Sequence, residues 1–284
     1  MKLRREDGRN EPEGDLDVAL AARFGAYASF VTPNDPIAVE FHGDSPAIEV
    51  DRLLDSYVNN SVDVLDLGCG AGFSLCRVAK HARSVLGIDL ETELLESARE
   101  RVLREGITNT EVLLGDTCDS KLVVQIPNSK FGVVFSRRGP FLTESLVNKL
   151  TDDAVFIVEL AQDFIGLKEL FGRTPFLPKS TGDPDFAISA QSGVGFVPVS
   201  AKSYWYEEYF SDAEHLARYL KQGAPLQNWW MDACPYEEKR DRPALDLYAS
   251  YNQTDKGIML VGHRRVYVFR RQKTQFYPVM NSRT

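Results

Sequence analysis

Apolar and polar residues follow two different periods in the middle of the chain. Short apolar runs, each followed by an acidic, glycine or serine residue, are typical of buried strands. These runs are residues 64–67, 85–88, 112–114 and 131–135. Between the runs, apolar residues recur at helical spacing, which predicts helices over about 73–82 and 91–104. Strands that alternate with helices favour a parallel sheet with helices on both faces, a doubly wound α/β fold.

The same pattern continues toward the C-terminus. Apolar periodicity predicts a fifth strand at 154–159, a sixth at 196–210 and a last one at 257–270. Two further segments interrupt this part of the chain. Residues 172–195 are rich in Pro, Gly, Ser and Asp and are expected to be a loop, and residues 222–256 form a C-terminal insertion with one helix in its second half.

The N-terminal part of the chain also shows helical spacing. Apolar residues predict one helix over 16–30, and a serine–proline pair predicts the start of another over 45–57. We therefore expect N-terminal helices over 16–58 and the main domain over 59–284. Residues 1–15 contain no apolar cluster and are expected to be a disordered lead-in.

A glycine-rich turn follows the first apolar run. Asp66 stands two residues before the first of three glycines on alternate positions, Gly68, Gly70 and Gly72. A strand that leads into such a turn and then a helix is typical of nucleotide-binding folds. Dinucleotide folds need G-x-G-x-x-G, but Phe73 occupies the position of their last glycine. A carboxylate next to the turn favours a cationic ligand over a diphosphate.

This D-x-G-x-G-x-G pattern resembles motif I of the class I S-adenosylmethionine-dependent methyltransferases. The resemblance continues in register, since Asp89 ends the second run 17 residues after Gly72, and Asp116 follows the third run. It implies a Rossmann-like, seven-stranded sheet whose last strand is antiparallel and pairs with the sixth. It also implies S-adenosylmethionine as the cofactor, S-adenosylhomocysteine as its product, and lid helices over 16–58 that cover the cofactor.

The resemblance implies a role at the cofactor for several residues. Asp66 would meet the ammonium group, Asp89 the two ribose hydroxyls, and Asp116 the adenine amino group. Two alternatives remain open: Asp66 caps the amides of the turn, or Asp116 is only a turn residue. The implied cofactor-binding residues are Asp66, Gly68, Cys69, Gly70, Gly72, Asp89, Leu90, Asp116, Thr117 and Ser136.

The acceptor side carries weaker signals. Methyl transfer depends on orientation more than on one catalytic group, so no catalytic residue is predicted. Arg137 and Arg138 are candidate ligands for a substrate carboxylate or phosphate; alternatively, one is exposed and the other pairs with an acid. Tyr27 and Trp229 are candidates for substrate contacts. His263 on the last strand is a candidate base, with a structural role as the alternative.

Composition narrows the class of partner. The chain has 284 residues and a formal net charge of −8, which disfavours nucleic acid as a partner. It has no run of 18 apolar residues, so no membrane span is expected. Its four cysteines form no C-x-x-C pair and its four histidines are scattered, so neither a metal site nor a disulfide framework is expected. This cysteine usage fits a reducing cytoplasm.

The sequence thus predicts a methyltransferase that acts on a small molecule. The alternatives are an RNA base methyltransferase and a protein that binds the cofactor without transferring the methyl group. Aromatic residues near Tyr27 and in the insertion at 222–256 are expected to form the remaining walls of the substrate pocket. The oligomeric state and the methylated atom are not predicted.

Overall fold

The computed structural model describes residues 37–172, 184–222 and 236–272. The strands are β1 (Ala38–Phe41), β2 (Asp63–Leu67), β3 (Ser84–Asp89), β4 (Thr110–Leu114), β5 (Phe131–Arg137), β6 (Leu150–Phe164), β7 (Phe196–Phe210), β8 (Gln253–Thr254) and β9 (Gly257–Arg271). The helices are α2 (Pro46–Tyr57), α3 (Phe73–Ala79), α4 (Thr92–Arg104), α5 (Ser120–Val123), α6 (Glu144–Val147), α7 (Leu167–Phe171), α8 (Pro184–Gly193), α9 (Ala213–Gln222) and α10 (Glu238–Tyr251).

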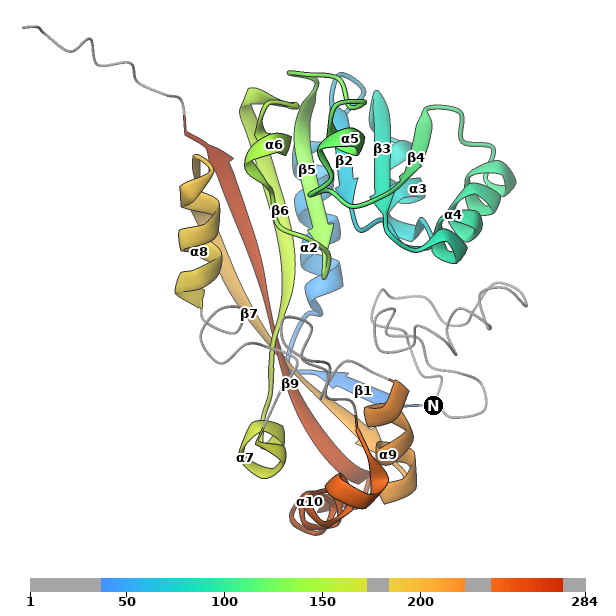
Figure 1. The fold of residues 1–284 in the computed structure, drawn as a ribbon, viewed down its shortest axis with the longest axis vertical. Coiled ribbons are helices and arrows are strands. Elements are labelled where there is room, and N and C mark those ends of the chain that lie inside the picture. Colours follow the sequence, from blue (N-terminus) through green and yellow to red (C-terminus); the bar gives the residue numbers. More distant parts are fainter. Residues whose placement is uncertain (1–36, 173–183, 223–235, 273–284) are drawn as a thin grey trace, which may run out of the picture.

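The described strands form one mixed sheet in the order β1-β7-β9-β6-β5-β2-β3-β4, with β8 paired to β9 (Figure 1). Strands β2 to β6 are parallel. Strand β9 is inserted antiparallel between β6 and β7, which confirms the predicted pairing of the sixth and last strands. Strands β3 and β5 lie on opposite sides of β2, so the strand order reverses there and the carboxyl ends of β2 and β5 border a ligand crevice in such folds.

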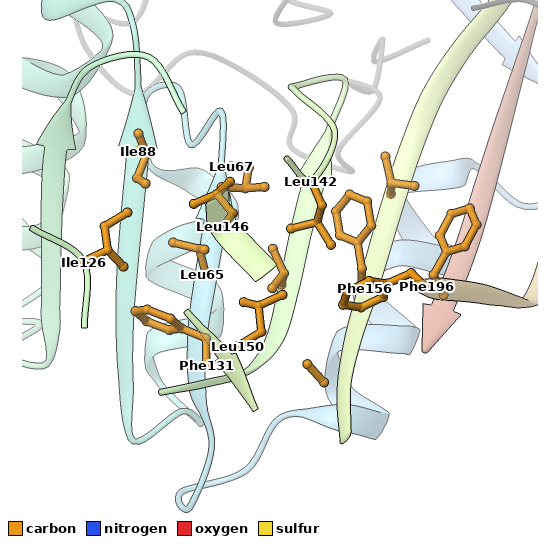
Figure 2. Close-up of a cluster of buried hydrophobic side chains, with 14 of the residues drawn as sticks. Leu65, Leu67, Ile88, Ile126, Phe131, Leu142, Leu146, Leu150, Phe156 and Phe196 are labelled. Carbon is orange, nitrogen blue, oxygen red and sulfur yellow. The ribbon is translucent and has the colours of Figure 1, made fainter. Parts of the chain in front are cut away.

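Side chains of the parallel strands pack alternately into two buried clusters. Leu65 and Leu67 lie in the cluster covered by α5 and α6, which Figure 2 shows in close-up. Val64 lies in the other cluster, under α2, α3 and α4. Because side chains alternate along a strand, Asp66 shares the face of Val64.

Strands β6, β7 and β9 are each 15 residues long and extend well beyond the parallel core. We call the part built on these extensions the distal lobe. It comprises β1, α7, α9, α10 and the adjoining ends of the three strands (Figure 1). Its own buried cluster is centred on Phe210, Leu216 and Tyr248. The arrow of β5 points toward this lobe, so the carboxyl ends of the parallel strands face it.

The predicted lid helices over 16–58 require a correction where the structure describes them. Residues 38–41 form the edge strand β1, which pairs antiparallel with β7. A strand of four residues is too short to show a clear period in the sequence. Helix α2 begins as predicted, with the Ser45 side chain accepting a hydrogen bond from the Ile48 amide at 3.3 Å. Its buried residues pack against β6 and β9, so it belongs to the core rather than to a lid.

The predicted loop at 172–195 also requires a correction. Its second half is helix α8, which packs against β7. Pro184 stands at the first position of this helix, where proline is tolerated because the missing amide has no partner there. Ala187 and Ile188 join the cluster of Figure 2. The predicted helix in the second half of 222–256 is confirmed as α10, whereas the lead-in at 1–15 lies outside the described residues.

Candidate functional site

The turn after β2 needs its glycines for conformational reasons. Gly68, Gly70 and Gly72 have φ angles of +75°, +53° and +79°, in the left-handed region that favours glycine. A Cβ atom on Gly72 would lie 3.0 Å from the Cα of Ala98 in α4. The turn is therefore held closely between the end of β2 and two helices.

A fourth glycine, which the sequence analysis missed, closes the other side of the turn. A Cβ on Gly139 would lie 2.5 Å from the Leu67 carbonyl oxygen and 2.9 Å from Ser136 Oγ. The loop after β5 consequently packs directly against the loop after β2. A glycine–proline pair following a buried strand is the signal that could have identified it.

Asp89 at the end of β3 is bound to this turn. Its Oδ2 accepts a hydrogen bond from the Gly70 amide at 2.7 Å, and its Oδ1 accepts one from the Glu91 amide at 3.0 Å. The next residue, Leu90, is 63% exposed despite its apolar side chain. The structure thus brings the predicted ribose acid to the glycine turn and places an uncovered apolar residue beside it.

Asp66 is the most unusual group of the site. It is 2% exposed, and its Oδ2 has no hydrogen-bond partner among the described residues. Burial raises the pKa of this carboxyl well above its usual value; the negative charge of Asp89 adds to the effect and Arg137 opposes it. The amides of Gly68 and Gly70 bond to other acceptors, so Asp66 does not cap them.

An unpartnered buried carboxylate oxygen is costly for the folded protein. A cationic ligand next to the turn would remove this cost. The residues present therefore fit a cofactor that carries an ammonium group.

The remaining predicted cofactor residues lie around the same strand ends. Asp116 Oδ1 accepts from the Cys118 amide at 2.8 Å, the arrangement of a turn residue, and Thr117 beside it is buried. Ser136 is fully buried, and its Oγ has no partner among the described residues. Cys69 is also buried, and burial raises the pKa of its thiol, so it serves as a small packing residue rather than a nucleophile.

Arg137 forms the ion pair that the structural alternative predicts. Its Nε donates to Glu159 Oε2 at 3.1 Å, and one of its terminal nitrogens donates to Ser74 Oγ at 3.0 Å. Glu159 is fully buried on β6 and also pairs with Arg264 at 3.1 Å. A buried carboxylate needs such cations, so both arginines are held inside the protein.

Glu159 was not among the residues predicted from the sequence, although a glutamate at the end of the apolar run 154–158 is a signal for it. Arg138 has a φ of +62°, an uncommon conformation for a residue with a side chain, and it is half-buried.

His263 has a structural environment. Its ring stacks on Trp205 with 4.1 Å between ring centroids, and it is 9% exposed. Burial lowers its pKa to about 4, with a further contribution from Arg265, so the ring is neutral near pH 7. This disfavours a role as general base. Tyr27 and Trp229 lie outside the described residues.

Among the described residues, no helix is long and apolar enough to cross a bilayer. In the same part of the chain, no group of three side chains is placed to hold a metal ion.

The chain is similar to known methyltransferases over the segment that carries the turn. A sequence model of the methyltransferase domain matches residues 64–154, from β2 to the start of β6. A ribosomal protein L11 methyltransferase from Clostridium botulinum is 29% identical over 115 residues, which are 36% of this chain and 37% of that protein. A protein-L-isoaspartate O-methyltransferase from Methanoculleus marisnigri is 24% identical over 150 residues, 51% of this chain and 61% of that protein. The chain thus spans less than two thirds of the length of either relative.

A solved structure matches a larger part of the chain than these relatives do. The crystal structure of a putative methyltransferase from Bacillus halodurans has a TM-score of 0.56 at 14% identity, over 79% of this chain and 99% of that one. Its likeness concerns the Rossmann-like fold alone. Together with the glycine turn and its two acids, the match of residues 64–154 and the similarity to these relatives support a class I S-adenosylmethionine-dependent methyltransferase domain.

Proposed function

We propose that this protein transfers a methyl group from S-adenosylmethionine to a small-molecule acceptor. Asp66 carries the proposal, because a buried carboxylate with an unpartnered oxygen at a G-x-G-x-G turn suits a ligand with an ammonium group. The family of the matched segment supports the same cofactor.

Residues at the strand ends would each bind a different part of the cofactor. Asp66 would hold the ammonium group, Asp89 the ribose hydroxyls, and Asp116 the adenine amino group with its second oxygen. Leu90 and Leu114 are 63% and 49% exposed at the ends of neighbouring strands, and they would cover the adenine. When bound, the cofactor supplies an electrophilic methyl group on a sulfonium ion.

The protein contributes orientation and exclusion of water. Holding two reactants in line corresponds to effective molarities of roughly 10⁵–10⁸ M in favourable cases. Gly68 and Gly139 support this role, because their backbones meet without side chains and fix the position of the loops that follow β2 and β5. The distal lobe faces the same strand ends, and it supplies chain for the acceptor half of the site.

The choice of a small-molecule acceptor rests on charge and on the extent of similarity. The net charge of −8 disfavours a polyanionic acceptor such as RNA. The relatives named for ribosomal protein L11 and for isoaspartyl proteins match only 36% and 51% of this chain, so their acceptors do not carry over.

Two measurements test the proposal. Calorimetric titration should show binding of S-adenosylmethionine and S-adenosylhomocysteine, and tighter binding of NAD would overturn the cofactor assignment. Transfer from radiolabelled S-adenosylmethionine should then be followed into small metabolites, ribosomal protein L11, an isoaspartyl peptide and RNA. Label confined to a macromolecule would refute the small-molecule acceptor. Binding without transfer to any of the four classes would favour a binding protein.

A further inference from the structure

A row of buried polar groups runs along one face of the sheet, from the cofactor side toward the distal lobe. We call Arg137, Glu159, Arg264, Tyr206 and Glu208 the polar row. Arg137 lies opposite Glu159 in the register of β5 and β6, and the two are bonded at 3.1 Å. Glu159 lies opposite Val266, and Arg264 is two positions along β9 on the same face, bonded to Glu159 at 3.1 Å.

The row continues onto β7. The Arg264 guanidinium lies 4.9 Å from the centre of the Tyr206 ring, a cation–π distance. Tyr206 lies across Gly262, whose added Cβ would be 2.2 Å from the ring. Glu208 is two residues further along β7 and therefore shares the face of Tyr206.

Glu208 ends the row in an apolar setting. It is 8% exposed, and its neighbours in the sheet are Val39 on β1 and Leu260 on β9. Tyr219 on α9 donates a hydrogen bond to the carboxylate. The other carboxylate oxygen, Oε2, has no partner among the described residues and is buried. The row thus ends in a carboxylate with one buried oxygen that accepts no hydrogen bond from the described residues.

We propose that Glu208 binds a basic nitrogen of the methyl acceptor, which makes the acceptor a small amine. The inference rests on the proposed function and deepens it by naming the class of acceptor. An ammonium group would supply both the missing hydrogen bond and the charge that a buried carboxylate needs. A neutral hydroxyl would supply only the hydrogen bond.

Two observations connect Glu208 to the methyl-transfer side of the site. Arg138 directly follows Arg137, the last residue of β5, and its amide donates to the Glu159 carbonyl at 2.9 Å. The charge of the same arginine favours the ionised form of Glu208, so the two side chains are close enough to interact electrostatically. Burial nevertheless raises the pKa of Glu208 to about 7, so a cationic partner would favour its ionisation.

The test compares two adjacent glutamates of β7. Glu208→Gln removes the charge at the end of the polar row. Glu207→Gln is the matched control, since Glu207 points to the opposite face and pairs with His42 at 2.9 Å. The probes are matched pairs of an amine and its alcohol: cyclohexylamine and cyclohexanol, phenethylamine and phenethyl alcohol, putrescine and 1,4-butanediol. Their binding is measured by calorimetry in the presence of S-adenosylhomocysteine.

The wild-type protein should bind at least one amine more tightly than its alcohol, by about ten- to a hundredfold for a charged hydrogen bond. Glu208→Gln should abolish that preference, and Glu207→Gln should keep it. A wild-type protein that prefers no amine, or a preference that survives Glu208→Gln, would overturn the inference.

Titration of the three proteins with S-adenosylmethionine separates this result from the proposed function. Affinity should be equal in all three, since neither glutamate lies at the glycine turn. Absence of cofactor binding in the wild type would refute the proposed function itself.

Discussion

Glu208→Gln should also stabilise the folded protein, and the effect should depend on pH. The wild-type side chain is 8% exposed, and one of its oxygens lacks a partner among the described residues. Glutamine has nearly the same shape and can keep the hydrogen bond from Tyr219 while removing the charge. The substitution therefore isolates the free energy of burying one carboxylate in the distal lobe.

The magnitude follows from the pKa of Glu208, which burial raises from 4.5 to about 7. Because the folded state holds the proton more tightly than the unfolded state, stability falls as the pH rises from 4.5 to 7. Above pH 7 the cost is complete and amounts to roughly 3 kcal/mol. Removing it should raise the melting temperature by up to about 10 °C at pH 8. At pH 4 the carboxyl is protonated in both states, so the difference should vanish.

Differential scanning calorimetry at pH 4 and pH 8 measures the difference in melting temperature between Glu208→Gln and the wild type at each pH. Glu207→Gln is the control on the same strand. Hydrogen bonds from Tyr209 and His42 lower the pKa of Glu207, so its substitution should reduce stability slightly at pH 8. The reasoning is refuted if Glu208→Gln melts at or below the wild-type temperature at pH 8, or if its effect is the same at both pH values.

Three further predictions concern the cofactor half and the walls of the pocket. Asp66→Asn should stabilise the ligand-free protein near neutral pH, because burial raises the pKa of Asp66. The same substitution should lower the affinity for S-adenosylmethionine by about ten- to a hundredfold. The control is Asp63→Asn on the same strand. It should destabilise the protein, because the Arg83 hydrogen bond lowers the pKa of Asp63, and leave the affinity for S-adenosylmethionine unchanged. Equal changes in melting temperature and affinity in the two variants would contradict this. Asp89→Ala should weaken binding of S-adenosylmethionine by a similar factor without unfolding the protein, and an unchanged dissociation constant in calorimetry would contradict the ribose role. Limited proteolysis should show protection within residues 1–45 or 222–256 when S-adenosylhomocysteine binds, and no change in either segment would mean an open groove.

The parallel half of the fold could be predicted from sequence because its signals are local. A buried strand, a glycine turn and a helix occupy only residues 64–79, and the φ angles of Gly68 and Gly70 follow from that short stretch. The ends of β7 were also predictable, since 15 residues of alternating pattern are bounded by a glycine and a helix cap. Short elements such as β1 carry too few residues for a period to show.

The site was predictable only where a residue stands at a strand end that the local sequence reveals. Asp89 ends β3 and accepts from the Gly70 amide, so its place beside the glycine turn could be inferred from its spacing to that turn. The pairing of Arg137 with Glu159 joins residues 22 positions apart, and that of Glu159 with Arg264 joins residues 105 apart. Such contacts depend on the order of strands in the sheet, which one sequence does not contain.

Strand order also explains why the cofactor and the acceptor halves differ in character. In the proposed function, the cofactor half is made by loops at the ends of short parallel strands, where folds of this kind bind their ligands. The other half is made by long strands, and inserting β9 between β6 and β7 carries the sheet past the crevice into the distal lobe. The same insertion places Arg264 beside Glu159, and it brings Tyr206 across Gly262. Glu208, in the distal lobe, is therefore joined to the cofactor side by buried groups on a single face of the sheet. Substitution of Glu208 should alter acceptor binding without altering the cofactor site.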